Sequence, residues 1–309
     1  MSPEAARVER IRVIVALSVI QIFFGVHYLA GKIVLKEIPP RAWAPIRVIS
    51  AALLLIAAAA ALGRRFPRAP RDLALLAVFS FFGVAVNQVC FVEGLSRTTA
   101  IHSAIITTLI PAWTLFFAVL LGRESPTVQK AASLVLAVVG VFLVIHPERA
   151  SFSSATFVGD LLTMLNSMSY SFFLVVSKRT MQRVDALAAT ALMFAFGAVP
   201  ILLFGGTALV RFDFGSVTAV AWFWAVFIVA VPTAGAYVLI SWTLARAEAS
   251  LVALFVYMQP VIATTLGIAF QHERLTTRTL AGALLIFAGV YLALRLPRLP
   301  GLRRAAPAS

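Results

Sequence analysis

The chain has 309 residues, of which 61% are hydrophobic and only 12% are charged, and its formal net charge is +14. A soluble domain carries about 25% charged residues, so this composition excludes an ordinary soluble protein. The positive charge lies between apolar segments and at the chain ends, which indicates arginine-rich loops at a membrane surface and not a nucleic-acid-binding surface.

Ten long apolar segments follow one another along the chain. Most are long enough to cross about 30 Å of hydrocarbon, which takes about 20 residues as a helix. Open strands leave backbone groups unsatisfied in a bilayer, so each segment is predicted to be a helix. The ten segments run roughly over 12–31, 42–62, 72–93, 100–121, 128–146, 157–177, 186–205, 218–242, 249–270 and 277–295. We therefore predict an all-α integral membrane protein of ten transmembrane helices.

The distribution of Lys and Arg predicts the orientation of these helices. With a cytoplasmic N-terminus, most of the basic residues lie on the cytoplasmic side, as the positive-inside rule requires. An even number of helices then puts both termini in the cytoplasm. The first segment follows Arg7, Arg10 and Arg12, but it is longer than the apolar core of a signal peptide, and we expect it to be a retained helix.

Two stretches of the chain repeat each other, 95–143 and 244–292. A shift of 149 positions without a gap places Pro111 on Pro260, Glu124 on Glu273 and Gly140 on Gly289. We predict two five-helix repeats, 12–146 and 157–295, between basic cytoplasmic tails at 1–11 and 296–309. Because five is odd, the repeats enter the membrane in opposite orientations, and such inverted repeats around a central cavity are typical of secondary transporters.

The repeat resembles a known family. Each copy contains small residues, then a proline, a glutamate and a glycine-bearing helix, as at Pro111 and Glu124 in the first copy. This repeated pattern resembles that of the drug/metabolite transporter superfamily and, within it, the EamA family. The stretch GVHYLAGKIVLKEIPPRAWAPIRVIS around Arg47 also resembles the start of an EamA unit, although no arginine matches Arg47 in the second unit. The resemblance implies ten helices around a cavity and the movement of metabolites or drugs, often export.

Polar and aromatic residues deep in the apolar segments are candidates for the cavity lining, because such side chains usually face protein or water. Asn166 and Tyr170 lie four residues apart, as do Ser103 and Thr107, so each pair shares a helix face. The structural alternatives are interfacial anchoring for aromatic residues and helix-to-helix bonding for hydroxyl groups. The predicted substrate-binding residues are His27, Asn87, Ser103, Thr107, Trp113, Asn166, Tyr170, Tyr237, Tyr257 and Gln259, with Tyr28 and Gln88 beside them.

Four further residues have predicted mechanical roles. Arg47 lies a few residues into the second segment and Glu93 ends the third on the same side, so we predict a gate or ion pair between them. The alternatives for Arg47 are an interfacial position with the side chain reaching the surface, or binding of a substrate carboxylate. Pro111 and Pro260 fall in the middle of segments, where proline favours a kink, either static or a hinge.

The leading functional hypothesis is a secondary transporter of small organic metabolites, such as amino acids or drugs, that works by alternating access and exports its substrate. The alternative is a membrane-embedded enzyme acting on lipid or isoprenoid substrates. The four histidines are scattered, no phosphate-binding GxxxxGK[ST] loop is present, and we expect no metal or cofactor. His27, Arg47 and Glu93 are compatible with proton coupling, and composition suggests a bacterial inner membrane. The sequence does not indicate an oligomeric state.

Overall fold

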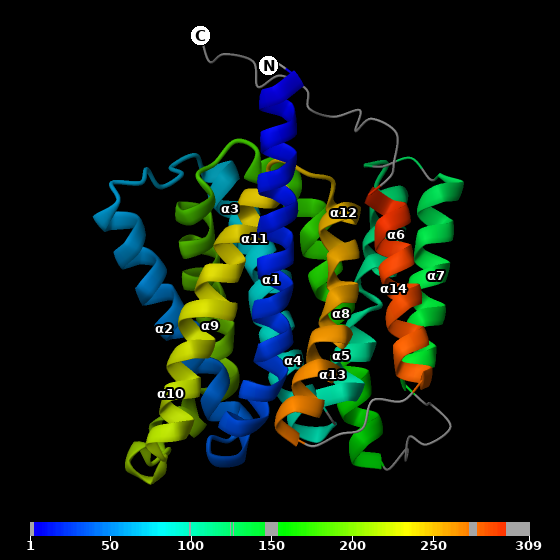
Figure 1. Ribbon diagram of the computed structural model, residues 1–309. Coiled ribbons are helices and arrows are strands. Elements are labelled where there is room, and N and C mark those ends of the chain that lie inside the picture. Colours follow the sequence, from blue (N-terminus) through cyan, green and yellow to red (C-terminus); the bar gives the residue numbers. More distant parts are fainter. Residues whose placement is uncertain are drawn as a thin grey trace.

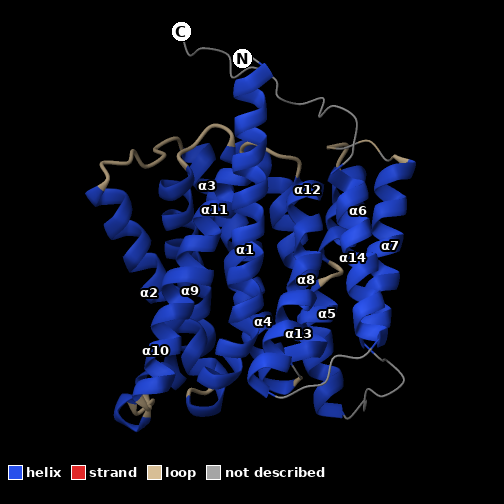
Figure 2. Cartoon of the chain, viewed as in Figure 1, coloured by secondary structure: helices blue, strands red, loops and turns tan. Residues whose placement is uncertain are grey.

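A computed structural model describes residues 3–294 apart from 99, 124, 126, 146–153 and 272–276. All regular structure in the described residues is helical (Figure 2). The helices lie side by side, roughly parallel or antiparallel to a common axis (Figure 1). We call the end of the bundle where α1 begins the upper end and the opposite end the lower end. Glu124, Glu273 and the predicted tail 296–309 lie outside the described residues.

Each of the ten predicted segments coincides with a helical span. The first five spans consist of α1 Pro3–Glu37, α2 Pro40–Ala61, α3 Pro70–Ser80 with η1 Phe81–Val86 and α4 Asn87–Arg97, α5 Ala100–Thr107 with α6 Ile110–Leu120, and α7 Val128–Ile145. The next five consist of α8 Ser154–Met181, α9 Ala186–Val210, α10 Ala219–Ile228 with η4 Val229–Gly235 and α11 Ala236–Leu244, α12 Ala249–Leu254 with η5 Phe255–Tyr257 and α13 Met258–Gln271, and α14 Thr277–Leu294. α1 begins at Pro3, so residues 3–11 of the predicted basic tail are helical and continue into the first span.

Local chemistry explains where several of these helices begin and end. Pro40 and Pro70 occupy the first turns of α2 and α3, where the missing N–H costs nothing. The Asp185 carboxylate accepts hydrogen bonds from the first backbone N–H groups of α9. Gly63 and Gly122 follow α2 and α6 with φ of 60° and 61°, the left-handed conformation that glycine adopts most easily after a helix.

The two matched prolines mark helix breaks, not the middle of continuous helices. Pro111 lies in the first turn of α6, which is separated from α5 by two residues. Pro260 is the third residue of α13, which follows the short 3₁₀ segment η5. Proline is tolerated in a first turn, so both prolines stand where a helical span is locally interrupted, and their role as hinges stays a prediction.

A π-helical segment interrupts the third span of each half, one segment per half. The two segments are η1, Phe81–Val86, and η4, Val229–Gly235, and the shift of 149 places 81–86 on 230–235. A π segment carries extra residues per turn and is frequently found at functional sites. The same rare geometry therefore stands at equivalent places in both repeats.

Equivalent helices of the two halves pack against each other. α2 packs along α9, and α7 packs along α14. The broken fourth span rises from α5 to α6 in Figure 1, whereas its equivalent descends from α12 to α13. Close helix contact depends on small residues at Gly94 and Gly159, since a Cβ on Gly94 would lie 3.0 Å from the Gly159 carbonyl oxygen.

Five helical spans of the described chain are long and apolar enough to cross a membrane. They are Arg7–Glu37, Pro40–Ala61, Pro70–Arg97, Ala186–Val210 and Ala219–Leu244. Shorter apolar helices accompany them at Ile110–Leu120, Val128–Gly140 and Ala249–Ala263. The fold is that of an all-helical membrane bundle built from two repeats.

Candidate functional site

A polar cavity lies where the two halves meet. It takes side chains from α1, α2, α4, α5, α6, α8, α11 and α13, so both repeats contribute. Its volume is about 50 Å³, which is room for one or two water molecules, whereas sites for small ligands measure about 300–1,000 Å³. The lining residues are Phe24, His27, Tyr28, Arg47, Asn87, Gln88, Phe91, Thr107, Ile110, Asn166, Tyr170, Tyr237 and Gln259.

Seven of the ten predicted binding residues line this cavity. They are His27, Asn87, Thr107, Asn166, Tyr170, Tyr237 and Gln259.

The other three predicted binding residues lie elsewhere. Ser103 and Tyr257 are fully buried away from the cavity, and Trp113 is only partly buried. The Ser103 hydroxyl, the Trp113 indole N–H and the Tyr257 hydroxyl have no hydrogen-bond partner among the described residues. A polar or aromatic side chain in an apolar segment was therefore not enough to predict a place in the cavity for these three residues.

One hydrogen-bond network crosses the boundary between the repeats at Tyr237. Gln88 Nε2 donates to the Tyr237 hydroxyl at 2.9 Å, and that hydroxyl lies 2.8 Å from Asn87 Oδ1. Asn166 Nδ2 donates to the Asn87 carbonyl oxygen at 2.9 Å, which ties α8 to α4. Gln88 and Tyr237 are separated by the repeat shift of 149 residues, so equivalent positions of the two halves bond directly to each other.

A second network joins α1 to α13. The Tyr28 hydroxyl donates to Gln259 Oε1 at 3.0 Å, and Gln259 Nε2 donates to Gln21 Oε1 at 2.7 Å. Gln21 is buried and was not predicted from sequence, although it stands seven residues before Tyr28 and hence on the same helix face. Phe24, Phe91 and Ile110 were also missed, because an apolar cavity residue has the same sequence signature as a core residue.

Arg47 is the charged side chain of the cavity lining. Its side chain is buried, with 2% of the residue exposed, so it does not reach the membrane surface as the interfacial alternative required. Nε donates to the Thr233 hydroxyl of η4 at 2.7 Å, and Cζ lies 5.8 Å from the centroid of the Phe91 ring. Nη1 is buried and has no partner among the described residues. His27 Nε2 and Gln88 Oε1, which line the same cavity, are also unpartnered.

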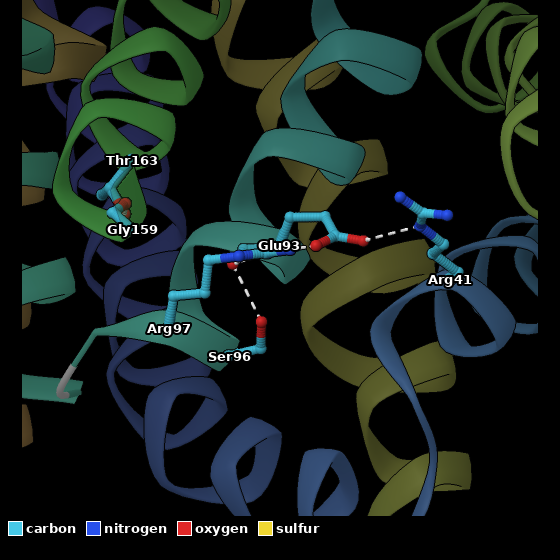
Figure 3. Close-up of polar contacts among 6 residues, drawn as sticks. All are labelled: Arg41, Glu93, Ser96, Arg97, Gly159 and Thr163. Carbon is cyan, nitrogen blue, oxygen red and sulfur yellow. Dashed lines mark hydrogen bonds and ion pairs between the residues drawn. The ribbon is translucent and has the colours of Figure 1, made fainter. Parts of the chain in front are cut away.

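Glu93 has partners other than the predicted one. Figure 3 shows its carboxylate between Arg97 on the same helix and Arg41 on α2. Arg97 bonds the carboxylate directly, and Arg41 Nε lies 3.9 Å from Oε1. The predicted Arg47–Glu93 pair is therefore wrong for this structure: Arg47 bonds Thr233, and Glu93 pairs with two other arginines near the lower end of the bundle.

The upper end has an equivalent contact of different chemistry. Arg246 occupies the repeat position of Arg97, and its guanidinium carbon lies 4.2 Å from the Trp242 ring centroid. Arg246 Nε also donates to Glu9 Oε1 on α1 at 2.7 Å. Trp242 stands at the repeat position of Glu93, so the two ends place an arginine over an acid in one half and over an indole in the other.

The described residues contain no group of three or more His, Cys, Asp or Glu side chains that could hold a metal ion. The chemistry offered by the cavity is therefore that of hydrogen bonding, aromatic contact and one buried guanidinium.

The comparison with protein families decides what kind of protein carries this cavity. The model of the EamA-like transporter family matches residues 11–146 and again residues 157–295. The chain belongs to the EamA-like transporter family. The two matches coincide closely with the predicted repeats, and the family is part of the drug/metabolite transporter superfamily.

Relatives of this EamA-like chain carry matching names. An "Uncharacterized transporter" of Archaeoglobus fulgidus is 25% identical over 283 residues, which cover 92% of this chain and 98% of that one. The "Uncharacterized transporter YvbV" of Bacillus subtilis is 28% identical over 298 residues, 91% of each chain. A solved crystal structure with 18% identity covers 92% of this chain and 98% of its own, with a TM-score of 0.73, and shows the same fold.

Family membership and the apolar helices together make this an integral membrane protein of a transporter family. A small-molecule substrate and a lipid bilayer are its implied partners.

Proposed function

We propose that this EamA-like protein is a secondary transporter that exports small organic metabolites, such as amino acids or related compounds, or drugs. Its two halves act as inverted repeats that open the central cavity alternately to each side of the membrane. The opposite directions of the α5–α6 and α12–α13 spans support this proposal, as does the packing of α2 on α9 and α7 on α14.

The observation that carries the proposal is Arg47 in the cavity wall. A buried guanidinium costs free energy in a membrane unless it is paired, and Nη1 has no partner among the described residues. A substrate carboxylate would complete it with a charge-assisted hydrogen bond. We therefore propose that Arg47 binds the carboxylate of the substrate, with His27 and Gln88 as further polar contacts and Phe91 beside the guanidinium.

The cavity must widen before it holds a metabolite, since its volume is about 50 Å³ in this structure. Thr107 and Ile110 flank the break between α5 and α6, and Gln259 lies at the start of α13 after the break that contains η5. All three residues line the cavity, so movement of these half-helices changes its volume. We propose that Pro111 and Pro260 keep the two breaks in place and act as hinges.

The proposed orientation follows the Lys and Arg distribution. Both termini, and hence the upper end, are cytoplasmic, and the Glu93 end faces outward. We propose the bacterial cell membrane as the location, which fits relatives such as the "Uncharacterized transporter YoaV" of Bacillus subtilis. His27 is the histidine of the cavity, and we propose that proton coupling acts through it; transport driven by an imposed pH gradient across the vesicle membrane tests this role.

Substrate counterflow in sealed vesicles tests the proposed function. Purified protein is first screened by thermal stabilisation against pairs of amino acids and their decarboxylated amines, since a ligand that binds only the folded state stabilises it. The amino acid that stabilises is then used for counterflow. We expect each effective amino acid to stabilise the wild type and its amine to have little effect.

Two variants separate a binding role of Arg47 from a general effect of charge. Arg47→Gln should lower counterflow more than tenfold, because a charge-assisted bond contributes about 1.5–3 kcal/mol, and Arg47→Lys should retain part of it. The matched control is Arg65→Gln, which removes an exposed positive charge from the loop after α2. Equal transport by Arg47→Gln and the control, or equal stabilisation by amine and amino acid, would remove the carboxylate proposal. Turnover of a lipid without sealed vesicles would instead support the enzyme alternative.

A further inference from the structure

A second hollow lies far from the central cavity, at the upper end of the bundle between α3 and α8. It is a groove of about 730 Å³ that shares no lining residue with the central cavity. Arg71 near the start of α3, Arg123 after α6, and Arg179 and Arg183 near the end of α8 form its charged part. We call this the arginine groove.

The groove has a surplus of positive charge. Arg183 forms an ion pair with Asp72 at 3.2 Å. Arg71, Arg123 and Arg179 have no ion-pair partner among the described residues. Partial burial lowers the pKa of Arg123, and the like charge of Arg179 lowers that pKa further. Arg123 and Arg179 both line the groove, and an anion between them would relieve the repulsion of their like charges.

The other part of the groove is apolar, and its residues follow the same helix faces as the arginines. On α3, Arg71 is followed at spacings of four and seven by Leu75 and Val78. On α8, Phe172 and Val176 precede Arg179 at spacings of seven and three. Both helices therefore present a stripe that changes from apolar residues within the bundle to arginine at its upper end. Val78 is 49% exposed, so the apolar part opens toward the surroundings of the bundle.

We propose that the arginine groove binds an anionic phospholipid of the leaflet at the upper end, with its phosphate between Arg123 and Arg179 and an acyl chain along Leu75, Val78 and Phe172. A free soluble anion would use the arginines only and leave the apolar stripe uncovered. A phospholipid matches both parts, since its charged group and its chains are arranged in the same order as the groove. This site is separate from the transport cavity and independent of the substrate proposed above.

Lipid binding to the purified protein in detergent tests the site. Phosphatidylglycerol is titrated while the thermal midpoint and the number of bound lipids, the latter by native mass spectrometry, are recorded. Phosphatidylcholine, inorganic phosphate and the deacylated glycerophosphoglycerol headgroup are titrated in parallel. We expect phosphatidylglycerol to bind and to raise the midpoint, and the two soluble anions to have no comparable effect at equal phosphate concentration.

The variant pair is Arg123→Gln/Arg179→Gln against Arg65→Gln/Arg68→Gln, which removes the same charge from an exposed loop at the same end. Each arginine near an anionic lipid contributes about a fivefold change in affinity, so the groove variant should bind phosphatidylglycerol about 30-fold more weakly. The loop variant should stay within about twofold of the wild type.

Three results would overturn the proposal. A rise in the midpoint with inorganic phosphate or the headgroup alone that equals the rise with the lipid would indicate a site for a free anion. Equal losses in the groove and loop variants would indicate general surface attraction. Equal binding of phosphatidylcholine would mean that the arginines do not select the anionic headgroup.

Discussion

The third helical spans of the two halves are alike in the middle and different at their ends. Both contain a π segment at the same repeat position, and they bond to each other through Gln88 and Tyr237. At the lower end Arg97 bonds the carboxylate of Glu93, whereas at the upper end its equivalent Arg246 lies over the Trp242 ring. The repeat thus conserves the placement of an arginine and changes the chemistry that holds it.

Each end contact also connects its span to a neighbouring helix. Glu93 reaches Arg41 of α2 at the lower end, and Arg246 reaches Glu9 of α1 at the upper end. The lower contact consists of ion pairs between the Glu93 carboxylate and the two arginines. The upper one combines a charge pair with a cation–π contact, which is less sensitive to salt because part of it is packing. Under the proposed alternating access, the two ends would therefore open at different energetic cost.

The largest expected effect comes from a substitution that displaces α2 from α9 at the lower end. A Cβ on Gly205 of α9 would lie 2.1 Å from the backbone carbonyl oxygen of Arg41, which cannot give way without a shift of the helix. Gly205→Ala should therefore lower the free energy of unfolding by about 3 kcal/mol, as overpacking of a tight contact does. The thermal midpoint of the purified variant in detergent measures this loss.

The adjacent glycine supplies the control for this substitution. A Cβ on Gly206 meets no atom within 4 Å, so Gly206→Ala should leave the thermal midpoint unchanged or slightly higher, because alanine is the better helix former. A fall of the same size in both variants would show that the helix itself, and not the α2–α9 contact, responds to the substitution.

The next effect concerns the middle, where the halves are alike. Tyr237→Phe removes the hydroxyl that accepts from Gln88 and lies within bonding distance of Asn87. Buried polar groups left without a partner should lower the free energy of unfolding by about 2 kcal/mol. A double-mutant cycle with Gln88→Leu measures the coupling by thermal unfolding. Strictly additive losses would mean that the contact between the halves contributes nothing.

Much of this arrangement could be predicted from the sequence, because membrane depth constrains polar residues strongly. His27, Asn166 and Gln259 lie in apolar segments, where a polar side chain must face the protein interior, and all three line the cavity. The partner of Arg47 could not be predicted, since two side chains at the same depth on different helices meet only if both helices have the right rotation. In the structure the partner of Arg47 is Thr233, and not the predicted Glu93.

The π segments carried no sequence signal of their own. Phe81–Val86 and Val229–Gly235 share their repeat position but little of their residue pattern, and Pro232 occurs only in the second. An extra residue in a helical turn is tolerated where packing on the neighbouring helices compensates for it. On η1 this packing includes Gly83, where a Cβ would lie 2.6 Å from the Phe173 ring. Such compensation is a tertiary property, which a single sequence does not reveal.

Salt separates the chemistry of the two ends. Glu93→Gln removes the carboxylate between Arg41 and Arg97 and should cost about 1 kcal/mol, a value discounted because both arginines are substantially exposed. In about 1 M salt, where the screening length falls to roughly 3 Å, the difference in thermal midpoint from the wild type should shrink. Trp242→Phe, which alters the ring beneath Arg246, should show a difference that changes little with salt. A parallel salt response in both variants would contradict the assigned chemistry.

The smallest effect should come from Glu9, because the upper end is held twice. Glu9→Gln removes the negative charge that pairs with Arg246, but the guanidinium keeps the Trp242 ring and donates from Nη1 to the Trp242 carbonyl oxygen at 3.0 Å. With both side chains partly exposed, the loss in free energy of unfolding should be about 0.5 kcal/mol. Combining Glu9→Gln with Trp242→Leu should cost more than the sum of the single changes, since Arg246 then loses both its acidic partner and its ring. If Glu9→Gln alone destabilised the protein as much as Glu93→Gln, the two ends would be held equally, and the difference between an acid and an indole would carry no mechanical meaning.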